Sequence, residues 1–165
     1  MNDKPRGYAQ FPVLEMPGNA VRRDFTLDER GAVVALVRCW FRGILPRGCT
    51  AGSDMDLVLS ELVANASVHG GGGEITLSVG HAGGRLLGRL VHRRPPAGDL
   101  LPKLEAVAQT SRLLLGESVK PEELVESSRG LLVVWHLSEG FTYRPESDRS
   151  VTAWAVPGCS CGGVW

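Results

Sequence analysis

The sequence predicts an α+β fold of two layers, in which a mixed, mostly antiparallel sheet carries helices on one face. Between positions 54 and 69, apolar residues recur at helical spacing and predict an amphipathic helix. Apolar and polar residues alternate from Ile75 to Val79, which predicts a strand with one buried face. With 165 residues, 43% of them hydrophobic, the chain is long enough for one globular domain with its own core.

The other elements follow from caps, turn residues and short apolar runs. The four glycines at 70–73 end the amphipathic helix, and Ala82-Gly-Gly-Arg85 forms a hairpin turn. In chain order the prediction is a disordered N-terminus over 1–10, an edge strand over 11–14, a helix from Thr26 or Asp28 to about Gly43, the helix over 54–69, strands over 75–79 and 86–91, a helix over 100–115, a short helix over 130–137, and strands over 141–143 and 151–156. The predicted domain spans 11–157, and a Gly/Cys tail occupies 158–165.

Glu61, Asn65 and His69 form a polar stripe on the helix over 54–69. Each lies one turn beyond the last, so their side chains point the same way. The Asn65 oxygen can hold a divalent metal ion while the Glu61 carboxylate orients a hydroxyl group or a water molecule. That pair suits phosphoryl transfer, where catalysis is mostly positioning and charge neutralisation. The same spacing also occurs on ordinary solvated helix faces, and both interpretations stay open here.

Two motifs resemble those of a known superfamily. The segment Glu61-Leu-Val-Ala-Asn-Ala-Ser-Val-His69 resembles the N-box of the histidine-kinase-like (GHKL, Bergerat-fold) ATPases. Within that superfamily the chain is most similar to the bacterial anti-sigma-factor serine kinases. The segment Glu126-Ser-Ser-Arg-Gly-Leu-Leu-Val-Val134 resembles their second glycine box, and the resemblance extends from about Phe11 to Pro157. It implies the Bergerat fold.

The resemblance also implies roles for single residues. Glu61 would be the catalytic carboxylate that orients the attacking serine hydroxyl of a protein substrate. Asn65 would bind the Mg²⁺ ion that accompanies ATP. Arg129, Gly130 and Leu131 would lie at a helix start that faces the ATP phosphates, where free N–H groups and the helix dipole favour anions.

The chain departs from the family pattern at two positions. The family has an aspartate that accepts a hydrogen bond from the adenine amino group, and this chain has His92 there, followed by Pro95 and Pro96. Ser128 stands where the first glycine of the second glycine box is expected. His69 matches a histidine frequent at the end of the family's N-box, and an interaction with the C-terminal helix dipole would explain it equally well.

These departures leave two functions open. The first is an ATP- and Mg²⁺-dependent serine/threonine kinase that phosphorylates an anti-sigma antagonist protein and so controls a sigma factor and transcription. The second is a non-catalytic member that regulates by protein binding without ATP. Residues 93–127 occupy the place of the family's nucleotide lid, where a mobile gate and a docking helix are both possible. Family members are often homodimers, so a homodimer is also possible here.

Charge and hydropathy exclude several partners. Eighteen basic and 18 acidic side chains give a formal net charge of zero, which argues against a general nucleic-acid or membrane-binding surface. No apolar stretch approaches the roughly 18 residues of a membrane span. Because the N-terminus also lacks a signal-peptide core, we expect a cytoplasmic protein.

The four cysteines receive different predictions. Cys39 lies in an apolar helical stretch and is expected in the core, and Cys49 lies in a loop. Cys159 and Cys161 form a Cys-x-Cys pair in the glycine-rich tail. Because one such pair lacks the other two ligands of a structural zinc site, the tail is expected to be reduced and disordered rather than a metal or redox site.

Overall fold

The computed structural model describes residues 14–27, 32–69, 72–93 and 126–161, and of residues 69 and 126–129 it describes the backbone alone. The predicted helix over 100–115, most of the segment compared with a lid, and residues 11–13 of the predicted edge strand lie outside the described residues. Leu14, the last residue of that predicted strand, has no regular structure.

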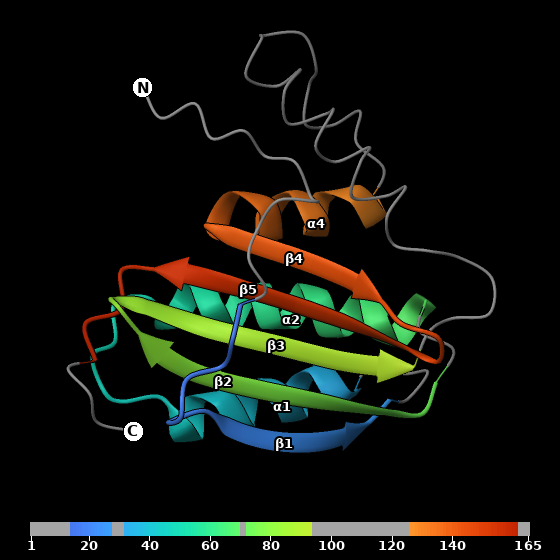
Figure 1. Cartoon of the computed structure of the whole chain (residues 1–165), viewed down its shortest axis with the longest axis horizontal. Helices are drawn as coiled ribbons and strands as arrows, with labels where there is room; N and C mark the ends of the chain where they lie inside the picture. The colour runs from blue at the N-terminus through green and yellow to red at the C-terminus, as the bar shows by residue number, and fades with distance from the viewer. Residues whose placement is uncertain (1–13, 28–31, 70–71, 94–125, 162–165) are drawn as a thin grey trace, which may run out of the picture.

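Five strands form one sheet in the order β1-β2-β3-β5-β4 (Figure 1). All four strand pairings are antiparallel, so the described sheet is wholly antiparallel where a mixed sheet was expected. Gly83 and Gly84 both have positive φ and close the two-residue hairpin between β2 and β3, as the sequence predicts. The strands are β1 (Val21–Thr26), β2 (Glu74–Ala82), β3 (Arg85–Arg93), β4 (Gly140–Pro145) and β5 (Arg149–Pro157).

Three helices are described: α1 (Ala32–Ile44), α2 (Gly52–His69) and α4 (Glu126–Leu137). Figure 1 shows α1 and α2 behind the sheet, and α4 packs against α2. The described part of the chain is therefore an α+β fold compatible with a two-layer sandwich.

The core lies between the sheet and these helices. The apolar stripe predicted on α2 is confirmed, because every one of its members is buried: Met55, Val58, Leu59, Leu62, Val63 and Ala66. Trp154 of β5 is fully buried, and its indole N–H donates to the Met55 sulfur at 3.1 Å. This contact joins the centre of the sheet directly to α2.

Several sequence predictions are wrong. Strand β1 was not predicted; it is an edge strand whose residues 22–24 are all charged and exposed. Cys39 is exposed on α1 rather than buried in the core. The tail residues 158–161 are ordered against the loop before α2, where Cys159 and Cys161 approach Cys49.

Candidate functional site

The two family-like motifs meet where α2 packs against α4. Glu61 lies on α2, half-buried, and its carboxylate presses against Gly130 of α4. A Cβ atom at position 130 would overlap Glu61 Oε2 and would stand 3.1 Å from Glu61 Cδ. The contact therefore depends on the absence of a side chain at Gly130, and it joins segments that are far apart in the sequence.

Asn65 lies one turn beyond Glu61 on the same helix and is half-buried. Its Nδ2 atom is buried and has no hydrogen-bond partner among the described residues. Buried polar groups in folded proteins are nearly always paired, so a group of this kind calls for an explanation, such as a ligand. An Asn side chain offers a donor and an oxygen acceptor, and the oxygen is a ligand type that Mg²⁺ accepts.

The chain connections bring His92 to the same end of the sheet. Residues 70–73 join α2 to the start of β2, where Ile75 pairs with His92 of β3. Figure 1 shows the end of α2, the start of β2 and the tip of β3 together. Helix α4 ends just before Gly140, which pairs with β5 at the end of the sheet opposite to His92. The beginning of α4 therefore lies nearer to His92 than its end does.

The His92 ring has a defined hydrogen-bonding state. Its Nδ1 atom lies 2.9 Å from the Arg93 carbonyl oxygen. Because a carbonyl oxygen only accepts, Nδ1 carries the proton, and the neutral ring presents Nε2 as an acceptor. Burial lowers the pKa of His92 below 6.5, and the hydrogen bond to Arg93 opposes this in part. His92 therefore favours a neutral ring in which Nε2 is the acceptor.

Sequence reasoning missed three polar residues beside His92. Ser150 pairs with His92 across β3 and β5, and Thr152 follows on the same face of β5. Both are fully buried, and the Tyr143 hydroxyl lies 3.1 Å from Ser150 Oγ. The signal was present in the sequence, because Thr152 is in phase with Trp154 in the predicted strand over 151–156, whose inward positions should be apolar. Ser150 continues the same phase just before that predicted strand.

The beginning of α4 differs from the prediction. The helix starts at Glu126, four residues before the predicted start at Gly130, so Ser128 and Arg129 lie inside it. In a helix that starts there, the N–H groups of Gly130 and Leu131 are taken by intrahelical bonds. Leu131 is buried in the core. Any anion at this end would therefore meet the backbone of residues 126–128 rather than that of Gly130 and Leu131.

His69 is the last residue of α2, which ends where the glycines predicted it. Its side chain lies outside the described residues, so both of its possible roles stay predictions.

The chain matches no protein-family model, and it matches no curated protein. Among the described residues, no helix combines the length and the apolar character needed to cross a membrane.

Proposed function

We propose that the chain has the Bergerat fold of the histidine-kinase-like ATPases and acts as an ATP-dependent serine/threonine kinase. Its substrate would be an anti-sigma antagonist protein, and phosphorylation of that protein would control a sigma factor. The observation that carries the proposal is the contact between Glu61 and Gly130, since it unites the two segments that resemble the N-box and the second glycine box. The regulatory partners rest on the resemblance alone.

The donor set suits Mg²⁺ and ATP. Asn65 would hold Mg²⁺ through its side-chain oxygen. Its buried Nδ2 atom has no hydrogen-bond partner among the described residues and is available for a further contact. His92 would accept a hydrogen bond from the adenine amino group at Nε2, because Nδ1 donates to Arg93. ATP supplies the phosphoryl group, and Mg²⁺ neutralises its charge when both are bound.

Glu61 would act on the protein substrate. Its carboxylate would accept a hydrogen bond from the serine hydroxyl, orient that oxygen toward the γ-phosphorus and receive its proton. The new oxygen–phosphorus bond would replace the bond to the β-phosphate oxygen, and ADP would be the leaving group. The half-buried position of Glu61 beside Gly130 restricts where the carboxylate can lie, and such positioning is the larger part of catalysis in phosphoryl transfer.

The residue that favours the non-catalytic alternative is His92, a neutral ring at the position where the family has the charged carboxylate that binds adenine. A neutral acceptor forms a weaker hydrogen bond than an ionised one. If adenine recognition has been lost, the chain would bind its antagonist or sigma factor with the same affinity in the presence and absence of ATP.

The test is thermal unfolding with and without Mg-ATP. With about 1 mM ligand and a dissociation constant of roughly 10 μM, binding would add ~2.7 kcal/mol to the free energy of unfolding. For a domain of this size, that corresponds to a rise in Tm of roughly 5–10 °C. We expect this rise in the wild-type protein and its loss in Asn65→Ala.

Ser67→Ala is the matched control, because Ser67 lies on the same helix and its hydroxyl donates to the Val63 carbonyl oxygen of that helix. It should keep the Mg-ATP shift. A wild-type Tm that does not change on addition of Mg-ATP would favour the non-catalytic alternative. If the shift is present, transfer of the γ-phosphate to a candidate antagonist should follow and should be lost in Glu61→Gln.

A further inference from the structure

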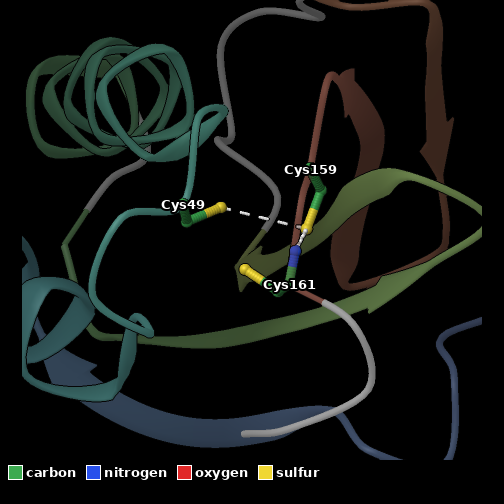
Figure 2. A group of neighbouring side chains, drawn as sticks. All are labelled: Cys49, Cys159 and Cys161. Carbon is green, nitrogen blue, oxygen red and sulfur yellow. Dashed lines mark hydrogen bonds between the residues drawn. The ribbon is translucent and has the colours of Figure 1, made fainter.

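Three cysteines that the proposed function does not use come together at the other end of the molecule. Cys49 lies in the loop between α1 and α2, and Cys159 and Cys161 follow β5. Their sulfur atoms all lie within 4.8 Å of one another. Figure 2 shows Cys49 and Cys159 facing each other with Cys161 beside them. The cluster thus joins segments that are far apart in the sequence.

Backbone and hydroxyl hydrogen bonds hold the two segments together. The Thr50 hydroxyl donates to the Gly158 carbonyl oxygen, and the Ser160 hydroxyl donates to that of Gly48 at 3.5 Å. The Cys159 N–H donates to the Gly84 carbonyl oxygen in the β2–β3 hairpin at 2.9 Å. Cys49 and Cys159 also pack against the hydrophobic core. The positions of these two thiols are therefore set by the fold.

The sulfur spacing fits metal coordination. The sulfur atoms of Cys49 and Cys159 lie 3.9 Å apart. Thiolates bound to one tetrahedral Zn²⁺ ion at about 2.3 Å lie about 3.8 Å from each other. A disulfide requires about 2.05 Å, so the pair would have to move together by almost half of its separation. The described arrangement is thus close to that of ligands around a shared ion.

We propose that Cys49, Cys159 and Cys161 bind one Zn²⁺ ion as three thiolates, with water in the fourth tetrahedral position. Soft thiolate ligands select Zn²⁺ over Mg²⁺ and Ca²⁺, and His, Asp and Glu contribute nothing to the cluster within the described part of the chain. Binding replaces three thiol protons, which pass to solvent, and leaves one net negative charge on the site. The Cys161 N–H, which lies 3.4 Å from the Cys159 sulfur, donates toward that charge.

A bound Zn²⁺ ion would keep its three coordinating thiols deprotonated. The metal would clamp residues 159–161 to the loop that leads into α2.

The first experiment is metal binding by the reduced, chelator-treated full chain. We expect one equivalent of Zn²⁺, proton release on binding and a rise in Tm. Co²⁺ in its place should give the sulfur-to-cobalt charge-transfer absorption and the intense visible bands of a tetrahedral thiolate site. Zinc-edge X-ray absorption of the wild-type protein should count three sulfur neighbours, and this measurement needs no variant to fold. Fewer than three would overturn the proposal.

Serine variants assign the ligands. Cys49→Ser, Cys159→Ser and Cys161→Ser should each lower zinc affinity by at least about 100-fold, because even changes beyond the direct ligands cost roughly 10–100-fold. Cys39→Ser is the matched control, since Cys39 is exposed on α1, and it should bind zinc as the wild type does. Zinc binding that survives all three cluster substitutions, or a Cys49–Cys159 disulfide that persists in reductant and excludes the metal, would contradict the proposal. Neither result depends on ATP binding.

Discussion

His92 couples the folded state to pH. Burial holds its pKa below the 6.5 of an exposed histidine, and its Nδ1–H is committed to the Arg93 carbonyl oxygen. At pH values between the lowered pKa and 6.5, His92 is protonated in the unfolded chain and neutral in the folded protein. The free energy of unfolding therefore rises with pH across that interval and is insensitive to His92 above it. Protonation would also remove the Nε2 acceptor assigned to adenine.

We expect His92→Gln to reduce the loss of stability on acidification, because Gln does not titrate. Denaturant unfolding between about pH 5 and about pH 8, the range in which histidines change charge, measures this slope. His136→Gln controls for the loss of one histidine, since His136 is exposed on α4. Identical slopes for the wild type and His92→Gln would refute the assigned role of burial.

The position of the Glu61 carboxylate depends on the absence of a side chain at Gly130. A methyl group at position 130 would overlap the tip of the Glu61 side chain, which is flexible and can rotate away. We therefore expect Gly130→Ala to displace the carboxylate while changing stability by less than about 1 kcal/mol, because alanine also favours the helix by roughly that amount. Phosphoryl transfer should fall toward that of Glu61→Gln while the Mg-ATP shift in Tm persists.

A double-mutant cycle tests this contact without reference to ATP. In the Glu61→Ala background the overlap is gone, so Gly130→Ala should stabilise the protein by up to about 1 kcal/mol. The two substitutions should then show a coupling of about 0.5 kcal/mol or more in denaturant unfolding. Additive effects would mean that Glu61 does not contact position 130 in solution.

At the scale of elements, Asp56 joins α2 to α1. The Asp56 carboxylate is buried, and its Oδ2 atom accepts hydrogen bonds from Arg38 at 3.2 Å and from Arg42 at 2.8 Å. The two arginines lie one turn apart on α1 and are largely exposed. Each pair alone contributes little because solvent screens it. Because the Asp56 carboxylate is buried, it needs at least one of the two arginines as a partner.

We expect Arg38→Ala and Arg42→Ala each to cost less than about 1 kcal/mol, since the remaining arginine still pairs with Asp56. The double variant should cost more than the sum, because it leaves a buried carboxylate without these partners. Denaturant unfolding measures each value, and Asp54→Ala on the same helix serves as an exposed control. Additive costs would argue against a shared carboxylate.

The elements also differ in how far the sequence determines them. Helix α2 and the β2–β3 hairpin were predicted because their signals are local, a helical apolar period in one and paired glycines in the other. Strand β1 was missed because its consecutive charged residues 22–24 obscure the alternation of a strand at the sheet edge. The cysteine cluster could not be found, since nothing local to position 49 indicates that the chain after β5 returns to it.

For the candidate site, spacing placed Glu61 and Asn65 on one face of α2, but their neighbours come from tertiary packing. The Glu61–Gly130 contact and the polar group around Ser150 depend on how α4 and β5 lie against α2 and β3. The earlier start of α4 moved Gly130 from the first turn into the second. A resemblance between motifs identifies residue types, whereas the packing of the whole chain decides which of them meet.

At the scale of the whole molecule, Trp154 links the sheet to α2 and packs over Gly88 of the neighbouring strand. These residues pair across β3 and β5, and the Trp154 indole occupies the space where a Gly88 side chain would project. A Cβ atom at position 88 would overlap the ring and stand 2.8 Å from its Nε1 atom. That nitrogen donates to Met55 of α2, so moving the ring would also disturb the contact between sheet and helix.

Gly88→Ala should therefore destabilise the protein by about 1–3 kcal/mol, because a buried rigid ring cannot yield as an exposed side chain does. Gly43→Ala on α1 is the control: nothing lies within 4 Å of the added carbon, so a gain of up to about 1 kcal/mol is expected. Denaturant unfolding gives both values, and near-UV circular dichroism reports the packing of the aromatic side chains, Trp154 among them. A Gly88→Ala variant as stable as the wild type would show that the Trp154 ring can move away from α2 without a loss of stability. The contact between Trp154 and Met55 would then not set the spacing between the sheet and α2.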